Sequence, residues 1–130
     1  MISEYILSKE EIRSINEQYG GSLRMDAEIE TALEAGKGKT IFRKIAYLLR
    51  AILVGHPFTD GNKRTALMVA LAMLEKSQIK VEEKQKERIV EEIRKIASEN
   101  IRDRRGDRQP KAVNQIKRIE RLVRYAVTGD

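Results

Sequence analysis

The chain has 130 residues, the size of one domain with a sizeable core, and its lack of cysteine excludes disulfide bonds and thiolate chemistry. Hydrophobic residues make up 41% and charged residues 35%, which is typical of a compact helical protein with a well-solvated surface. The net charge is +6, and residues 102–124 account for all of it with nine cations against three acids.

The start of the chain does not have the pattern of a signal peptide, because Glu4, Lys9 and Glu10 interrupt it. The apolar run at residues 65–74 is too short to span a bilayer, which takes about 20 residues. We therefore expect a cytoplasmic protein that makes no membrane contact.

The first helix is predicted from local signals at both of its ends. Ser8 and Glu11 have the spacing of a capping box, so the helix begins at about Lys9. Gly20 and Gly21 are expected to end it. Residues 22–25 then form a connector.

Two further helices follow before residue 55. Asp26 can cap the second, which ends at Gly36 and whose inward residues are Ile29, Ala32 and Leu33. Thr40 can cap the third, which extends up to Gly55. Its apolar residues recur at helical spacing and are Ile41, Ile45, Leu48, Leu49 and Ile52.

The second half of the chain predicts three more helices. Residues 65–74 are almost wholly apolar, so this helix is expected to be buried on most sides and to end at about Lys76. After a break at residues 77–81, residues 82–101 are amphipathic, with Ile89, Ile93, Ile96 and Ala97 facing inward.

Residues 102–110 are expected to form a loop, with Pro110 at the first position of a last helix. The apolar side of that helix is lined by Val113, Ile116, Ile119, Leu122, Val123 and Ala126. The whole predicts an all-α bundle of about six helices without strands or internal repeats.

The chain is organised around residues 56–64, HPFTDGNKR, which we call the signature stretch. It holds the only histidine, a carboxylate, a glycine, an amide and two adjacent cations, and it precedes the apolar helix directly. We expect a polar loop that leads into the N-terminus of a core helix. Such N-termini present unpaired N–H groups and the positive end of the helix dipole, which suit phosphate binding.

The residue types in the signature stretch suit a nucleotide site. Gly61 lets the backbone approach a ligand, and Asn62, Lys63 and Arg64 place a donor and two cations beside the helix N-terminus. Asp60 offers the hard oxygen that Mg²⁺ takes alongside phosphates.

His56 has the side chain best suited to accept a hydroxyl proton near neutral pH, while Phe58 is expected to point inward and hold the loop on the core. Plainer roles exist for each residue. A single histidine before proline is more often structural, Asp60 and Gly61 fit a turn, and the cations fit a solvated helix end. The combination is more specific than any one residue.

The signature stretch resembles the Fic/Doc signature, H-x-F-x-[D/E]-[G/A]-N-[G/K]-R. Lys63, where the Fic branch usually has glycine, and the following Thr65-Ala66-Leu67 resemble the Doc (death-on-curing) branch. Two upstream segments are also similar to Doc-type sequences, and they are YGGSLR at residues 19–24 and ETAL at residues 30–33.

The resemblance covers about residues 5–101 and implies a Fic/Doc-type helical bundle. Residues 1–101 would form the catalytic domain, and residues 102–130 a basic C-terminal loop and helix packed on it. The resemblance further implies the use of ATP and Mg²⁺, with His56 as general base for a hydroxyl of a target protein and Asp60 as metal ligand. The residues that would bind the nucleotide are Gly61, Asn62, Lys63 and Arg64.

Fic enzymes transfer AMP to a Ser, Thr or Tyr hydroxyl, whereas Doc-type enzymes are kinases of a translation elongation factor. A lysine at position 63 fills space and adds charge in the anion hole, so the nucleotide could bind in the opposite sense and present another phosphorus. Position 67, a second arginine in many Fic enzymes, is Leu67, which agrees with Doc.

The resemblance therefore implies a Doc-like toxin. The family's inhibitory motif, [S/T]-x-x-x-E-[G/N], is absent from the sequence, which implies inhibition by a separate antitoxin. Two alternatives stay open, a Fic-type protein adenylyltransferase and a non-catalytic module that binds nucleic acid or protein.

A glycine- and lysine-rich segment follows the second predicted helix. Residues 36–40, GKGKT, match the end of a P-loop, but Leu33 replaces the required glycine and no strand precedes them. The resemblance instead assigns them to the flap that aligns a target segment beside the site, and a flexible connector is the plain alternative.

The basic segment could contact nucleic acid weakly, or form the charged outer face of an ordinary helix.

Overall fold

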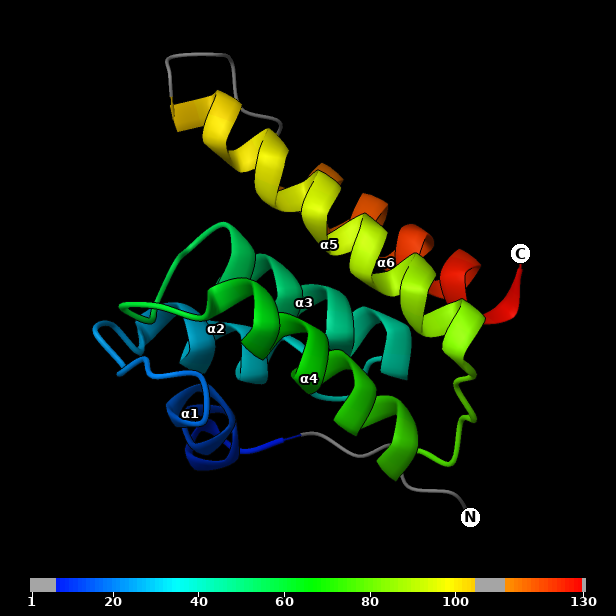
Figure 1. Cartoon of the computed structure of the whole chain (residues 1–130), viewed down its shortest axis with the longest axis horizontal. Helices are drawn as coiled ribbons and strands as arrows, with labels where there is room; N and C mark the ends of the chain where they lie inside the picture. The colour runs from blue at the N-terminus through cyan, green and yellow to red at the C-terminus, as the bar shows by residue number, and fades with distance from the viewer. Residues whose placement is uncertain (1–6, 105–111, 130) are drawn as a thin grey trace.

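Six helices make up the part of the chain that the computed structural model describes, residues 7–104 and 112–129 (Figure 1). The all-α prediction is confirmed, and the described residues contain one isolated β-bridge but no strand. None of the described helices is long and apolar enough to cross a membrane. The helices are α1 (Lys9–Glu17), α2 (Ala27–Ala35), α3 (Ile41–Leu53), α4 (Asn62–Lys76), α5 (Glu83–Arg104) and α6 (Ala112–Thr128).

Helix α3 lies at the centre of the bundle, and α2, α4, α5 and α6 all pack against it. Figure 1 shows α5 and α6 side by side, with α1 on the far side of the bundle from them. Ile45, Leu48 and Leu49 of α3 are fully buried, as the helical spacing predicts. Buried side chains from every helix join this one core. The site described below is therefore built against a single packed core.

The helix starts that depend on a local side chain are confirmed at α1 and α3. Ser8 Oγ accepts a hydrogen bond from the N–H of Glu11, and Glu11 Oε1 accepts one from the N–H of Ser8, which completes the capping box. Thr40 Oγ1 accepts from the N–H of Arg43. Each contact joins residues three apart, so the sequence alone specifies it.

The cap predicted at Asp26 is wrong, although α2 does begin after it. Asp26 has helical backbone angles, φ −103° and ψ −10°, and its side chain makes no capping hydrogen bond. Its carboxylate instead accepts a hydrogen bond from Lys9 Nζ at 3.2 Å, and Glu30 accepts one from the same ammonium at 2.7 Å. The Asp26 side chain thus links α1 to α2 and does not cap the N–H groups at the start of α2.

Helix α4 is less enclosed than its apolar sequence predicts. Ala66, Val69 and Ala70 are fully buried, but Met68 is 36% exposed and Leu67 and Leu71 are only partly buried. One face of α4 is therefore open to solvent along its length. Leu67 lines the cleft described in the next section.

Helix α5 continues beyond the end predicted for it. It runs to Arg104, so residues 102–104 are helical and not part of a loop, and the boundary expected at residue 101 falls inside a helix. The inward placement of Ile89, Ile93, Ile96 and Ala97 is confirmed. The rest of the expected loop, with Pro110, and the side chain of Val113 lie outside the described residues.

Part of the basic C-terminal segment forms ion pairs within the fold. Arg118 pairs with Glu99 of α5. Arg124 donates to Glu120 at 3.2 Å and lies over the Phe42 ring, 5.8 Å from its centroid. These two arginines hold α6 on α5 and α3.

Glu120 gives the bundle a pH-dependent contact between α3 and α6. Arg43 donates to it through Nε at 2.6 Å, and this bond lowers the pKa of Glu120 from its ordinary 4.5. A lowered folded-state pKa adds stability above the unfolded value, which is lost as the pH falls through the folded value.

We expect Glu120→Gln to lower the free energy of unfolding by roughly 1–2 kcal/mol at pH 7, with the difference shrinking below about pH 4. Urea unfolding at several pH values measures it. Glu17→Gln is the matched control, because Glu17 is 59% exposed and pairs with Arg13 at 3.6 Å, and it should have little effect at any pH. A Glu120→Gln deficit that is the same at pH 3 and pH 7 would contradict the ionic contribution.

Candidate active site

Residues 54–61 join α3 to α4, and we call them the central loop. A neighbouring segment, residues 22–25, holds this loop by backbone hydrogen bonds. The N–H of Arg24 donates to the carbonyl of Pro57 at 2.8 Å, the N–H of Thr59 donates to the carbonyl of Ser22 at 3.0 Å, and Leu23 forms a β-bridge with Phe58. The predicted connector is therefore a structural support of the site.

Residues 36–40 lie far from the central loop, so the prediction that they align a target segment beside it is wrong. Thr40 caps the start of α3, whereas the central loop follows the end of α3. The 13 residues of that helix separate the two ends by about 20 Å. The segment that lies beside the central loop is instead residues 22–25.

Phe58 and Asn62 fix the shape of the central loop. Phe58 is 1% exposed and belongs to the core, as predicted. The side-chain amide of Asn62 donates to the carbonyl of Phe58 at 3.0 Å, and its oxygen accepts from the N–H of Phe58 at 3.3 Å. The Asn62 side chain thus bridges the N–H and the carbonyl of Phe58 and holds the loop against the start of α4.

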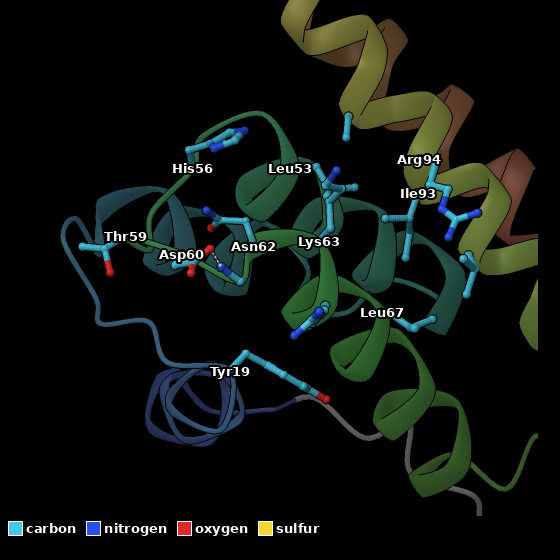
Figure 2. Close-up of a pocket in the computed structure, with 14 residues that line it drawn as sticks. Tyr19, Leu53, His56, Thr59, Asp60, Asn62, Lys63, Leu67, Ile93 and Arg94 are labelled. Carbon is cyan, nitrogen blue, oxygen red and sulfur yellow. Dashed lines mark hydrogen bonds between the residues drawn. The ribbon is translucent and has the colours of Figure 1, made fainter.

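His56 lines the cleft that opens beside the central loop (Figure 2). Its φ is +48°, which is uncommon for a residue with a side chain and requires support from its surroundings. Arg24 Nη2 donates to the carbonyl of His56 at 2.8 Å, and the N–H of His56 donates to the carbonyl of Ile52 at 3.3 Å. Main-chain contacts therefore fix the backbone that carries the imidazole.

The N-terminus of α4 has no side-chain cap. Gly61 occupies the cap position with φ +74°, and the first intrahelical bond runs from the N–H of Thr65 to the carbonyl of Gly61. The N–H groups of the three residues before Thr65 therefore have no partner within the helix. Lys63 and Arg64 are exposed beside them, and Arg64 lies over the Tyr19 ring, 5.9 Å from its centroid. This arrangement suits an anion.

Asp60 is exposed immediately before that helix end. Its Oδ1 accepts a hydrogen bond from the N–H of Gly61 at 2.8 Å, so the carboxylate does take part in the local turn. Among the described residues no cluster of three or more His, Asp or Glu side chains could hold a metal ion. Asp60 could hold Mg²⁺ only together with ligand oxygens, and Mg²⁺ commonly binds to one or two carboxylates plus phosphates.

Asn16, at the end of α1, holds the central loop and α4 together. It is fully buried, and its Nδ2 donates to the carbonyl of Asp60 at 2.8 Å and to Thr65 Oγ1 at 3.0 Å. Gly21 lies against the same atoms, since a Cβ there would be 2.4 Å from both Asn16 Oδ1 and the Asp60 carbonyl. In the sequence, Asn16 is only one polar residue of an amphipathic helix, so its contact with the central loop could not be predicted.

We expect Asn16→Ala to lower the free energy of unfolding by about 2 kcal/mol, because the substitution leaves two acceptors without their donor. Thr65→Val is the matched variant, since it removes only one of the two hydrogen bonds, and it should cost about half as much. Urea unfolding compares them. Equal losses would mean that the bond to the Asp60 carbonyl contributes no stability.

The cleft has a volume of about 660 Å³, within the range of small-ligand sites. All six residues proposed from the sequence line it, and they are His56, Asp60, Gly61, Asn62, Lys63 and Arg64. The sequence did not indicate the opposite wall, which α5 supplies through Val90, Ile93, Arg94 and Ala97. Ile93 and Ala97 were predicted as core residues only, since nothing local relates α5 to the signature stretch.

A model of the Fic/DOC family matches residues 7–74, which run from just before α1 to near the end of α4 and include the signature stretch. Helices α5 and α6 lie beyond the matched region. A search of curated proteins and a search of solved structures each found no match.

Proposed function

The chain belongs to the Fic/DOC family, and from this premise we propose that it transfers the terminal phosphate of ATP to a Ser, Thr or Tyr hydroxyl of a target protein. Enzymes of this family are in general nucleotide-dependent transferases that modify proteins. The observation that carries the proposal is the convergence of His56, Asp60 and the uncapped N-terminus of α4 on one cleft.

The cleft fits a nucleotide with its metal ion. Its volume suits a small ligand, unpartnered backbone N–H groups and two cations lie at one end, and an exposed carboxylate lies beside them. Lys63 and Arg64 would bind phosphate oxygens, and Asp60 would hold Mg²⁺. When bound, the metal ion would supply positive charge that offsets the charge developing on the phosphates.

His56 would act as general base. It accepts the proton of the target hydroxyl while that oxygen forms its bond to the terminal phosphorus and ADP leaves. The fixed backbone on either side of His56 would keep the imidazole in position. Asn62 and Asn16 would contribute indirectly, by holding the loop that carries His56 and Asp60.

Lys63 and Leu67 favour phosphate transfer over AMP transfer. Lys63 adds bulk and charge at the helix N-terminus, and Leu67 places an apolar side chain on the wall of the cleft where many Fic enzymes have arginine. We further propose a Doc-like toxin that acts on a translation elongation factor and is held inactive by a separate antitoxin. The supports for this step are the resemblance to Doc and the lack of an inhibitory motif in the sequence.

Labelled ATP tests the reaction. The purified protein is incubated with cell extract and Mg²⁺, and with ATP labelled either at the γ or at the α phosphate. We expect γ label on a protein band and none with the α label. Transfer of α label would establish AMP transfer instead, and the absence of both labels at every protein concentration would exclude both activities.

Asp60→Asn tests the metal ligand, because asparagine keeps the oxygen that accepts from Gly61 but removes the charge. We expect the Mg²⁺ concentration for half-maximal transfer to rise at least tenfold. Removing even a residue that only hydrogen-bonds to a metal ligand commonly weakens metal affinity by roughly that factor. Titration of transfer against Mg²⁺ measures it, with Glu28→Gln as a control carboxylate outside the cleft lining. An unchanged Mg²⁺ requirement would remove Asp60 from the metal site.

A further inference from the structure

Helix α5 forms the wall of the cleft opposite the signature stretch, and this wall lies outside the residues that the family model matches. Most of its contribution is apolar, from Val90, Ile93 and Ala97. Arg94 is the exception. In Figure 2 its side chain extends from α5 toward the cleft, while Lys63 extends from α4 toward α5.

The cleft contains an excess of positive charge that the signature stretch only partly explains. Three cations line it, Lys63, Arg64 and Arg94, against the single carboxylate of Asp60. Lys63 and Arg64 belong to the first turn of α4, whereas Arg94 belongs to another helix. A ligand with one anionic group can be bound by the α4 end alone. Cations on both walls match a ligand with more than one anionic group.

Few contacts within the protein hold the Arg94 side chain in place. Its side chain is 69% exposed, and its ion pair is with Glu91, three residues earlier, at 3.8 Å. A surface pair of this length holds an arginine only weakly. Helix α4 contributes no carboxylate to the lining of the cleft that would compete with a ligand for Arg94.

We propose that Arg94 is a phosphate-binding residue that makes the site selective for nucleoside di- and triphosphates over monophosphates. It contacts the part of the phosphate chain that the N–H groups of α4, Lys63 and Arg64 leave uncovered. Guanidinium binds phosphate through paired hydrogen bonds, which makes arginine suited to this position. The inference rests on the proposed function, because it assumes that a nucleotide occupies the cleft.

The test compares nucleotide affinities of the full chain by isothermal titration calorimetry, with AMP and with ATP, both in excess Mg²⁺. The variants are Arg94→Ala, Arg94→Lys and Lys95→Ala. Lys95 is the matched control, because it is the next residue of α5, it has an acidic partner three residues earlier in Glu92 at 3.4 Å, and it does not line the cleft.

We expect Arg94→Ala to weaken ATP binding about tenfold, as the loss of a charge-assisted hydrogen bond would, and to change AMP binding less than twofold. Arg94→Lys should recover part of the ATP affinity, and Lys95→Ala should match the wild type. Equal ATP affinity in the wild type and Arg94→Ala, or an equal loss for AMP and ATP, would overturn the assignment while leaving the proposed function standing. Wild-type protein that binds neither nucleotide would exclude both.

Discussion

His56→Asn is expected to lower the rate of protein labelling by 10² to 10⁴, the usual contribution of a positioned general base. Asparagine is the informative substitution because the backbone at position 56 has φ +48°, and asparagine tolerates positive φ better than alanine does. The variant therefore removes the proton acceptor without straining the central loop. Rates under single-turnover conditions measure the effect on the chemical step.

The hydrogen bonds at position 56 indicate that the substitution removes the imidazole and leaves the backbone in place. Arg24 and Ile52 contact only the main chain of His56, so those bonds survive the substitution. Nucleotide affinity should therefore stay within about twofold of wild type, since the phosphate-binding groups lie on α4. If His56→Asn kept more than a third of the wild-type rate, His56 would be a structural residue and another base would have to be sought.

Much of the fold could be predicted because its signals are local in the sequence. The capping box of Ser8 and Glu11 and the Thr40 cap each involve residues three apart, and the apolar spacing of α3 repeats along one helix. The same local reasoning was wrong for Asp26. The Asp26 carboxylate binds Lys9, which is 17 residues away in the sequence, in place of the N–H groups of α2. No local sequence pattern indicates such a long-range contact.

The site could be predicted only as far as the signature stretch extends. Its residues are consecutive, and all but Pro57 and Phe58 line the cleft, so their types alone indicated a phosphate site. The parts that were missed are joined to it by contacts across long sequence separations. Asn16 is bonded to residue 60, Thr59 to residue 22, and Arg94 faces the cleft from a helix that begins at residue 83. Such pairings follow from packing and not from a sequence pattern.

Gly21 shows how a correct local interpretation can miss a second role. Gly20 and Gly21 were predicted to end the first helix, and α1 does end shortly before them. Only Gly20 has a positive φ, +79°, and a Cβ there would meet nothing within 4 Å. Gly21 instead lies where α1, the segment at residues 22–25 and the central loop meet, and its lack of a side chain lets the loop carbonyl approach.

Gly21→Ala is therefore expected to damage both stability and activity. The new methyl group would be 2.4 Å from the Asp60 carbonyl and from Asn16 Oδ1, so the loop backbone has to move. We expect a loss of about 1–3 kcal/mol in the free energy of unfolding, typical of overpacking. Displacing Asp60 and His56 by even about 1 Å should lower the transfer rate a further hundredfold in protein that is still folded.

Gly20→Ala is the matched control, because it costs roughly 1–2 kcal/mol through its left-handed backbone but touches no part of the site. Urea unfolding gives the stability of both variants, and labelling rates are then compared at a temperature where both are folded. The two substitutions should be similar in stability and differ about a hundredfold in rate, since only one of them moves the loop. If the rates were the same, the contact between Gly21 and the Asp60 carbonyl would hold the fold without positioning the site.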